Sequence, residues 1–267
     1  MNKIKNTIEH IALSITDLSI GYKSKKEICK IAIELNFKVR QGELSAIVGV
    51  NGIGKSTLLR TLGKVQPKLS GGIELNHKGL NKYSSLELAS KVSLVLTEPL
   101  ASKNLTVMEL IALGRQPYTN WIGRLSELDK SKINEAIAMV DLENLKNKKC
   151  YELSDGQLQR VMIARALAQD TSIILLDEPT SHLDLHHKVQ ILKLLKEIAH
   201  KTQKTVVYTS HEIEMAIQLC DKILIMNDKG HEFGKPNELI EKGSFERLFP
   251  KDTIKFDAKT SSFKIKK

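Results

Sequence analysis

The residues from Gly49 to Thr57 have the types and the spacing of a phosphate-binding loop. They fit the pattern G-x-x-x-x-G-K-[ST], in which Lys55 is followed by the hydroxyl of Ser56. Glycines let the backbone wrap a polyphosphate, N–H groups at the start of a helix face the anion, and the lysine adds a positive charge. Ser56 is then a candidate Mg²⁺ ligand. The pattern indicates a nucleoside triphosphate without saying which one or for what purpose.

The flanking sequence supports this interpretation over a glycine-rich turn that happens to precede a lysine. Leu44–Val48 is an apolar run typical of a buried strand, and Ser56–Arg60 reads as the start of a helix. A strand, a glycine loop and a helix in that order are the context that such a loop requires.

An acidic pair, Asp177 and Glu178, follows a second apolar run, Ser172–Leu176. At a strand end near a phosphate loop, Asp177 can hold Mg²⁺ and Glu178 can polarise the water that attacks the γ-phosphate. The alternative is a strand-end pair that caps a helix.

A third segment, Leu153–Gln157, precedes the helical run Leu158–Leu167. Ser154 and Gln157 have the spacing of a capping box, which prepares the N–H groups of a helix start to meet an anion. A capped helix alone would be ordinary.

The elements that must position these residues alternate between strands and helices. Residues 11–20 and 31–39 alternate as antiparallel strands do, whereas the continuous apolar runs at 172–176, 205–208 and 223–226 are typical of a parallel sheet. Between them, residues 99–170 change character. A capping box at Thr106 and Glu109 opens a helix through Leu113, a loop over Gly114–Arg124 carries the only tryptophan, and another helix carries one apolar face: Ile133, Ala136, Ile137 and Val140. The sequence therefore predicts an α/β fold with a parallel-sheet nucleotide core, an antiparallel β subdomain and an inserted helical subdomain at about 99–170.

Composition and charge argue against a membrane-spanning, a secreted or a nucleic-acid-binding protein. The 267 residues contain 41% hydrophobic and 27% charged residues, as ordinary globular proteins do, and no apolar run approaches a membrane span. The basic start has no apolar core behind it, so residues 1–10 read as a loose end and not a signal peptide. Three dispersed cysteines fit reduced thiols better than a disulfide or a metal set.

The net charge is +10, but the lysines are scattered and aromatic residues make up 4%, which argues against nucleic acid as a partner. The run Lys146–Lys149 is read as a solvated face, and attraction to anionic lipid stays open.

Five motifs in this order resemble those of an ABC ATPase: Gly49–Ser56, Leu153–Gln157, Ile173–Asp177, Ser181–Asp184 and His211. The resemblance covers about residues 11–263. It implies a RecA-like core in an ATPase domain over 11–250, with 251–267 as a short C-terminal extension. It also implies a head-to-tail dimer of two copies, in which two ATP molecules lie between one subunit's phosphate loop and the other's signature.

The resemblance assigns a role to each matching residue. Glu178 and the γ-phosphate contact His211 would be catalytic, Ser56 and Asp177 would bind Mg²⁺, and Asp184 would lie in a loop that crosses the dimer interface. ATP would contact Tyr22, Gly49, Asn51, Gly52, Gly54, Lys55, Ser56 and Thr57 of one copy and Ser154, Gly156 and Gln157 of the other. Taken alone, a strand-end histidine is more often structural, and Tyr22, which matches the aromatic that stacks on adenine, could also be a core residue.

Two positions depart from the family pattern. Asp155 stands where the signature usually has its second glycine, and we expect its carboxylate to point away from a nearby anion. Residues Val95–Glu98 contain no glutamine, which the family uses to link Mg²⁺ and water to the membrane partner. Thr97 aligns with it most directly and Glu98 is adjacent, so either could supply an oxygen ligand.

Narrower features resemble the ATPase subunits of importers for iron–siderophore complexes, haem and vitamin B12. They are Asn104–Tyr118 with Gly123–Ser126, Ser181–His187, and the tail segments Phe245–Phe249 and Phe256–Asp257. A metal site at His182, His186 and His187 is the less favoured reading, because no cysteine or acidic cluster accompanies them.

That group implies a peripheral protein on the cytoplasmic face of the inner or plasma membrane, with a separate transmembrane permease and an extracytoplasmic substrate-binding protein. Two other functions remain open: a soluble ABC ATPase acting on nucleic acid or ribosomes, and the motor of an exporter.

Overall fold

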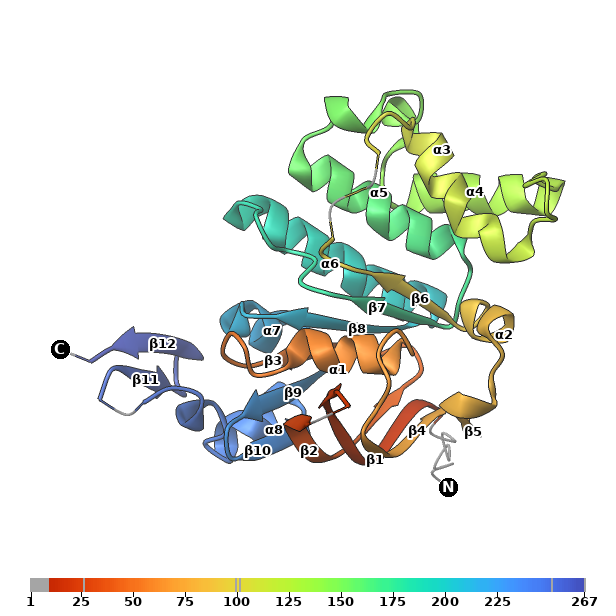
Figure 1. Cartoon of the computed structure of the whole chain (residues 1–267). Coiled ribbons are helices and arrows are strands. Elements are labelled where there is room, and N and C mark those ends of the chain that lie inside the picture. Colours follow the sequence, from red (N-terminus) through yellow and green to blue (C-terminus); the bar gives the residue numbers. More distant parts are fainter. Residues whose placement is uncertain (1–9, 26, 99, 101, 251, 267) are drawn as a thin grey trace, which may run out of the picture.

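The computed structural model describes residues 10–25, 27–98, 100, 102–250 and 252–266. The predicted loose end at residues 1–10 lies, except for His10, outside the described residues. At the centre is a six-stranded sheet in the order β10-β9-β3-β8-β7-β6 (Figure 1). Its strands are β3 (Leu44–Val48), β6 (Val92–Val95), β7 (Ile173–Leu176), β8 (Thr205–Ser210), β9 (Lys222–Asn227) and β10 (Gly230–Gly234). All neighbours pair in parallel except β10, which runs antiparallel to β9.

This sheet is buried on both faces, which explains the continuous apolar runs of its strands. Because successive side chains point to opposite faces, Ile173 and Leu175 of β7 join one apolar cluster, while Ile174 and Leu176 join another. Helix α1 (Lys55–Leu62) and the antiparallel sheet pack on the face with Ile173 and Leu175, whereas the helices within residues 107–168 and 185–219 pack on the face with Ile174 and Leu176. The predicted parallel core is confirmed.

The antiparallel sheet has the order β2-β1-β4-β5. Its strands are β1 (Ile11–Lys23), β2 (Ile28–Arg40), β4 (Ser70–Leu75) and β5 (Lys78–Gly79), and β4 and β5 are followed by η1 (Leu80–Lys82) and α2 (Ser85–Ala89). The prediction for the first strand was wrong in two respects. The strand continues through Tyr22, which pairs with Cys29, and its alternation breaks over Leu18–Gly21, where four successive residues are buried beside register shifts.

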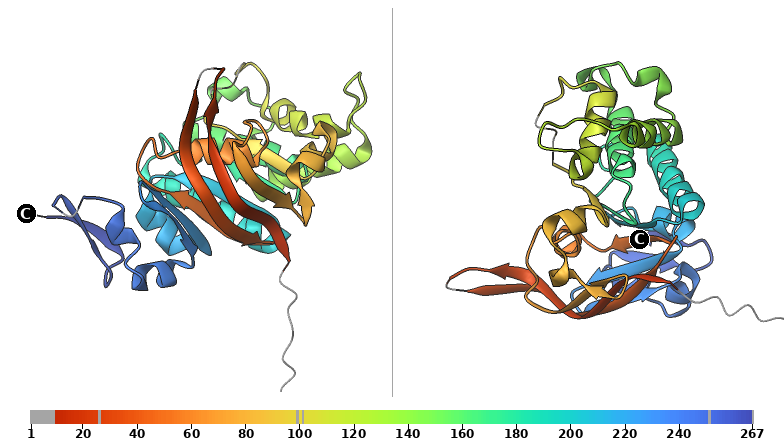
Figure 2. Two further views of the ribbon diagram at one scale, coloured as in Figure 1. Left: turned by 60° about the horizontal axis from the view of Figure 1, so that its bottom comes forward. Right: turned by 90° about the vertical axis from the view of Figure 1, so that its right-hand side faces the viewer.

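Helix α1 (Lys55–Leu62) follows the phosphate loop and lies between the two sheets. Leu58, Leu59 and Leu62 are essentially inaccessible and pack with side chains from β1, β4 and the central sheet. Figure 2 shows the long β1–β2 ribbon reaching past the rest of the molecule. Helix α1, which follows the phosphate loop, is thus packed against both sheets.

The helical part stands at the β6–β7 side of the central sheet (Figure 1). It contains α3 (Val107–Ala112), η2 (Leu113–Tyr118), α4 (Glu127–Met139), η3 (Glu143–Leu145), η4 (Cys150–Glu152) and α5 (Asp155–Ala168). The capping boxes at Thr106 and Ser154 both form as predicted. The prediction of a loop over Gly114–Arg124 was wrong at its start, because η2 continues from α3 through Tyr118.

The base of the segment after η2 is pinned by a buried ion pair. Arg115 Nε lies 2.8 Å from Asp129 Oδ1, and the two side chains are 4% and 5% exposed. Arg115 also donates from Nη1 to the carbonyl of Ala168 and lies over the ring of Tyr118. The pKa of Asp129 falls to about 2, mainly because Ser126 donates hydrogen bonds to it, and Arg115 adds to the effect. The pair therefore ties the Gly114–Tyr118 segment, which contains Arg115, to the start of α4, where Ser126 bonds Asp129.

The chain ends with α6 (Leu185–Thr202), α7 (Ile213–Leu219), α8 (Pro236–Glu241), η5 (Phe245–Arg247) and the hairpin β11 (Ile254–Asp257) and β12 (Ser262–Ile265). Rings of the hairpin pack on the preceding turn, with Phe256 5.2 Å from Phe245 and Phe263 5.1 Å from Phe249 between centroids. The cysteines are free thiols, exposed at Cys29 and buried at Cys150 and Cys220. Among the described residues, no helix is both long and apolar enough to cross a bilayer.

Candidate nucleotide-binding site

The carboxyl ends of four adjacent strands bring the predicted chemistry together. In the sheet, Val48 pairs with Ser210, Tyr208 with Leu176, and Leu176 with Val95. The residues that follow these strands are therefore neighbours at one edge: the phosphate loop after β3, His211 after β8, Asp177 and Glu178 after β7, and Thr97 after β6. This edge is where open α/β sheets bind ligands.

The phosphate loop is shaped by its glycines. Gly54, the residue before α1, has φ 103°, and a Cβ there would lie 2.2 Å from Cγ2 of Ile31 on β2. A Cβ on Gly49 would lie 2.4 Å from the carbonyl oxygen of Met226. Asn51 and Gly52 lie exposed at the crest of the loop, and Gly52 has a φ of 81°. A side chain at Gly49 or Gly54 would therefore clash with Met226 or Ile31 and displace the loop.

Lys55 is buried within this loop, with 5% of its surface exposed. Its Nζ donates to the carbonyl oxygens of Gly49 at 3.0 Å and Val50 at 3.1 Å. Burial lowers the pKa of Lys55, and the carboxylates of Glu178 and Asp177 partly oppose that shift. The amine is thus held inside the loop, next to the acidic pair.

Tyr22 reaches the same region from β1. Its side chain is 56% exposed, so it is not a core residue, and its hydroxyl lies 3.3 Å from Oγ1 of Thr57 in α1. The ring therefore flanks the loop and is open to solvent, as an adenine-stacking residue must be.

The acidic pair is organised by Thr209, a residue that the sequence analysis did not single out. Asp177 is 4% exposed, and its Oδ1 accepts a hydrogen bond of 2.7 Å from Thr209 Oγ1. The same hydroxyl accepts from the backbone N–H of Glu178 at 2.8 Å. One side chain on β8 therefore orients both Asp177 and the backbone that carries Glu178.

Glu178 has φ 46°, a left-handed conformation that is uncommon for residues other than glycine and that recurs at functional sites. Its Oε2 lies 3.9 Å from Nδ1 of His211, and His211 Nε2 lies 3.5 Å from Oε1 of Glu212. Glu212 is in turn paired with Lys188 of α6. The histidine is thus held between two carboxylates, one of which is anchored to α6.

The two candidates for the missing glutamine lie in different surroundings. Thr97 Oγ1 donates to the carbonyl oxygen of Asp177 at 3.1 Å, whereas Glu98 is paired with Arg60 of α1 at 3.1 Å. Both line a cleft of about 340 Å³ that Asp177, Glu178 and Asp155 also line. Thr97 is therefore tied directly to the acidic pair, and Asp155 is open to the same cleft.

The signature residues belong to the helical part. Ser154 Oγ accepts from the N–H of Gln157, and the Gln157 side chain accepts from the N–H of Ser154. Gly156 is buried under α6, where an added Cβ would lie 2.8 Å from Cδ2 of His187. Among the described residues, no hydrogen bond or ion pair joins Ser154 to the phosphate loop of its own chain.

His187 connects the signature to the loop before α6. Its backbone N–H and its Nδ1 both lie 2.8 Å from the carboxylate of Asp184, whose side chain is the N-cap of that helix. His182 and His186 are exposed, and no cluster within the described part of the chain could hold a metal ion. The side chain of His187 is 44% exposed, and its ring lies beside Gly156.

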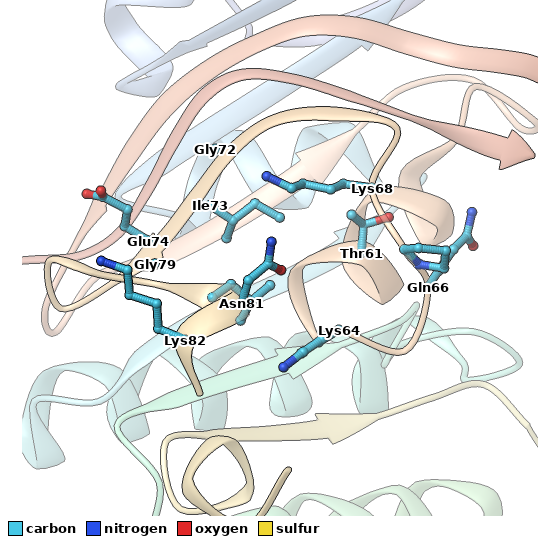
Figure 3. A pocket seen from close by; sticks show the side chains of 12 residues that line it. Thr61, Lys64, Gln66, Lys68, Gly72, Ile73, Glu74, Gly79, Asn81 and Lys82 are labelled. Atoms are coloured by element: carbon cyan, nitrogen blue, oxygen red, sulfur yellow. The ribbon is translucent and has the colours of Figure 1, made fainter. Parts of the chain in front are cut away.

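A separate pocket of about 270 Å³ lies behind α1, between the α1–β4 connection and η1 (Figure 3). Lys64, Lys68 and Lys82 line it, but the amines of Lys64 and Lys68 already bond the carbonyl oxygens of Tyr83 and Gly71. It contains none of the predicted site residues, whereas Thr97, Glu98, Asp177 and Glu178 line the cleft at the strand ends.

Comparison with known proteins agrees with this geometry. The family model described as ABC transporter matches residues 32–181. A petrobactin import ATP-binding protein of Bacillus anthracis is 37% identical over 217 residues, which are 81% of this chain and 80% of that protein. A transporter described as of the metal-chelate type, solved in an inward-facing conformation, superposes with a TM-score of 0.77 at 30% identity and covers 90% of this chain and 89% of its own.

A second solved structure is a dimeric ATP-binding cassette in a post-hydrolysis state with ADP and Pi. It is 30% identical with a TM-score of 0.71, and the match covers 84% of this chain and 98% of that one. The match of the family model spans more than half of the chain, and it includes the phosphate loop, the signature and the acidic pair. The chain therefore belongs to the ABC transporter family.

Proposed function

We propose that this chain is the ATP-hydrolysing subunit of an importer for an iron chelate, a haem or a cobalamin. The observation that carries the ATP-hydrolysing role is the convergence of the phosphate loop, Asp177, Glu178 and His211 at one sheet edge. Lys55 supplies positive charge for the phosphates, and the loop N–H groups and the start of α1 orient them. Tyr22 flanks the base.

The residues present suit a magnesium ion. Ser56 offers a hydroxyl and Asp177 a buried carboxylate, which are the hard oxygen donors that Mg²⁺ prefers. Thr209 binds Oδ1 of Asp177, and among the described residues no hydrogen bond to its Oδ2 is found. The ion, when bound, neutralises charge that develops on the phosphates. Thr97 or Glu98 would complete its surroundings.

In the hydrolysis step, Glu178 polarises the attacking water and His211 contacts the γ-phosphate. Glu212, paired with Lys188, holds His211 from the side opposite Glu178. Water attacks the γ-phosphorus in line with the leaving ADP oxygen, so that one P–O bond forms as the other breaks and phosphate is released.

The second half of the site comes from another copy of the chain. Ser154, Gly156 and Gln157 would face the γ-phosphate of the neighbouring copy, with Asp184 at the interface. The capping box fixes the start of α5 and bonds the N–H groups of Ser154 and Gln157, which leaves those of Asp155 and Gly156 to face an anion. The dimeric cassette with ADP and Pi supports it as well.

The transport assignment rests on the relatives. The petrobactin import protein and the metal-chelate type transporter favour import over export and metal chelates over other cargo. The chain would act at the cytoplasmic face of the membrane, bound to a separate permease to which an extracytoplasmic binding protein delivers the chelate.

ATP hydrolysis by the Glu178→Gln variant tests the catalytic assignment. It should bind MgATP like the unaltered chain and hydrolyse it at least ~100-fold more slowly, as expected for loss of a general base. Glu87→Gln, an exposed glutamate on α2, is the matched control and should hydrolyse normally. Undiminished turnover by Glu178→Gln would remove Glu178 from the mechanism.

The cargo requires a different experiment. Affinity purification of the chain from its own membranes should recover a permease, and a ferric siderophore, haem or cobalamin should stimulate ATP hydrolysis by that complex in lipid. Stimulation by nucleic acid or ribosomes without a permease would favour the soluble alternative.

A further inference from the structure

The turn between η2 and α4 exposes two adjacent bulky apolar side chains. Trp121 is 93% exposed and Ile122 is 69% exposed. Trp121 is the only tryptophan of the chain, and it lies on a turn where a polar residue would cost nothing. Neither side chain lines the cleft at the strand ends or is among the predicted ATP-binding residues.

Hydrogen bonds to Asn120 fix this turn. Its Oδ1 accepts from the N–H groups of Ile122 at 3.2 Å and Arg124 at 3.1 Å, and its carbonyl oxygen accepts from Gly123 at 2.9 Å. Gly123 has φ 75°, which a glycine adopts without strain. The turn therefore holds the two side chains outward, at little further cost in conformational entropy when they are buried.

The base of the turn is also rigid. Tyr118 lies under the guanidinium of Arg115, 4.0 Å from it, and its hydroxyl donates to the carbonyl oxygen of Gln169. Arg115 is locked by its buried pair with Asp129. The tip, defined as Asn120–Arg124, is thus a fixed projection of the helical part.

The chemistry of the tip fits a lipid surface. A projecting pair of side chains offers no groove for a peptide or a helix, but it can enter a fluid interface. Tryptophan is enriched at the headgroup level of membranes, and arginine beside it can reach phosphates. Arg124 is exposed, and no hydrogen bond or ion pair of its guanidinium is found within the described ranges. The net charge of +10 favours an anionic leaflet.

We propose that the Trp121–Ile122 tip enters the headgroup region of an anionic bilayer and holds the helical part against the membrane. This rests on the membrane location proposed above. Two side chains give weak, reversible binding of the free chain that excess lipid makes measurable, and attachment to a permease would raise their effective concentration at the surface.

The only tryptophan makes the test direct. The full chain is mixed with vesicles of equal parts phosphatidylcholine and phosphatidylglycerol, and both tryptophan emission and co-sedimentation are measured. The emission should shift to the blue as the exposed indole leaves water. Trp121→Ala should weaken co-sedimentation about tenfold, since the largest apolar group is lost. Ile122→Ser, which keeps the reporter, should reduce the blue shift.

Tyr151→Ala is the matched control, because Tyr151 is an aromatic residue of the helical part that is 62% exposed. It should bind vesicles like the unaltered chain. All variants should hydrolyse ATP normally, which separates this proposal from the catalytic one.

Three results would overturn the proposal. The first is the absence of a blue shift with anionic vesicles. The second is that Trp121→Ala binds vesicles as well as the unaltered chain. The third is a blue shift that lipid vesicles do not cause but a permease in detergent does. The last would assign the tip to a protein contact.

Discussion

Thr209 donates a hydrogen bond of 2.7 Å from its hydroxyl to Oδ1 of Asp177. The same oxygen accepts the N–H of Glu178, so a residue on one strand positions the two carboxylates at the end of the next. Asp177 is buried and the Glu178 side chain is 27% exposed, so water cannot easily replace the Thr209 hydroxyl between them.

Thr209→Val should therefore lower the rate of ATP hydrolysis by about 10- to 100-fold, the usual cost of removing a partner that orients a metal ligand. Thr209→Ser should keep most of the activity. Thr205→Val is the matched control, since Thr205 is fully buried on the same strand but bonds the carbonyl oxygen of Arg40 away from the site. If Thr205→Val and Thr209→Val lost the same activity, Thr209 would have only a structural role.

The contact between Gly156 and His187 predicts a non-additive pair. Alanine in place of a helical glycine normally stabilises by about 0.5–1 kcal/mol. In the unaltered chain, Gly156→Ala should lose that gain, because the new Cβ would lie 2.8 Å from the ring. In a His187→Ala background, the same change should raise the free energy of unfolding. Thermal and urea unfolding of the four proteins would measure this, and strict additivity would contradict the contact.

The buried pair of Arg115 and Asp129 predicts a large loss of stability. Arg115→Ala leaves a carboxylate that is 5% exposed without its cation, and it should cost about 3–5 kcal/mol. Lys130→Ala removes an exposed ion pair with Glu127 in the same region and should cost less than about 1 kcal/mol. Urea unfolding at neutral pH compares them. Equal losses would mean that burial does not set the strength of the pair.

Asp129 also predicts an acid dependence of stability. Its folded pKa of about 2 lies below the ordinary value of 3.8, so the folded state favours the ionised form. The stabilisation, about 2 kcal/mol, should be complete above pH 4 and should fade as the pH falls towards 2. Asp129→Asn should flatten the fall of stability over this window. A fall of unchanged steepness in that variant would contradict the assignment.

The sequence was most informative where the chemistry is local. The phosphate loop and the capping boxes at Thr106 and Ser154 each depend on residues within a few positions of one another. The apolar runs at β7 and β8 likewise required a sheet covered on both faces. These predictions needed no knowledge of distant contacts.

Contacts between distant segments were beyond that reasoning. Thr209 looks like an ordinary strand residue until β8 pairs with β7, although its position just before His211 is a signal that could have been used. The contact between His187 and Gly156 depends on how α5 packs against α6, and no local sequence pattern predicts that packing. The extent of β1 was missed because register shifts bury successive residues and break the alternation.

In the proposed mechanism, one chain holds half of an ATP site and a second copy supplies the rest. The solution mass of the Glu178→Gln variant in MgATP tests it most directly, because this variant should accumulate the ATP-bound state. A shared site should give the mass of two chains with ATP and of one chain without it.

Ser154→Asp, added to Glu178→Gln, sharpens the measurement. Aspartate caps a helix as well as serine does, but its charge would repel a phosphate of the neighbouring copy. This double variant should bind ATP and stay a single chain, while Ser85→Asp, added to Glu178→Gln in the exposed first turn of α2, should still dimerise. A Glu178→Gln chain that binds MgATP and remains single, or a dimer that Ser154→Asp does not weaken, would contradict the shared site.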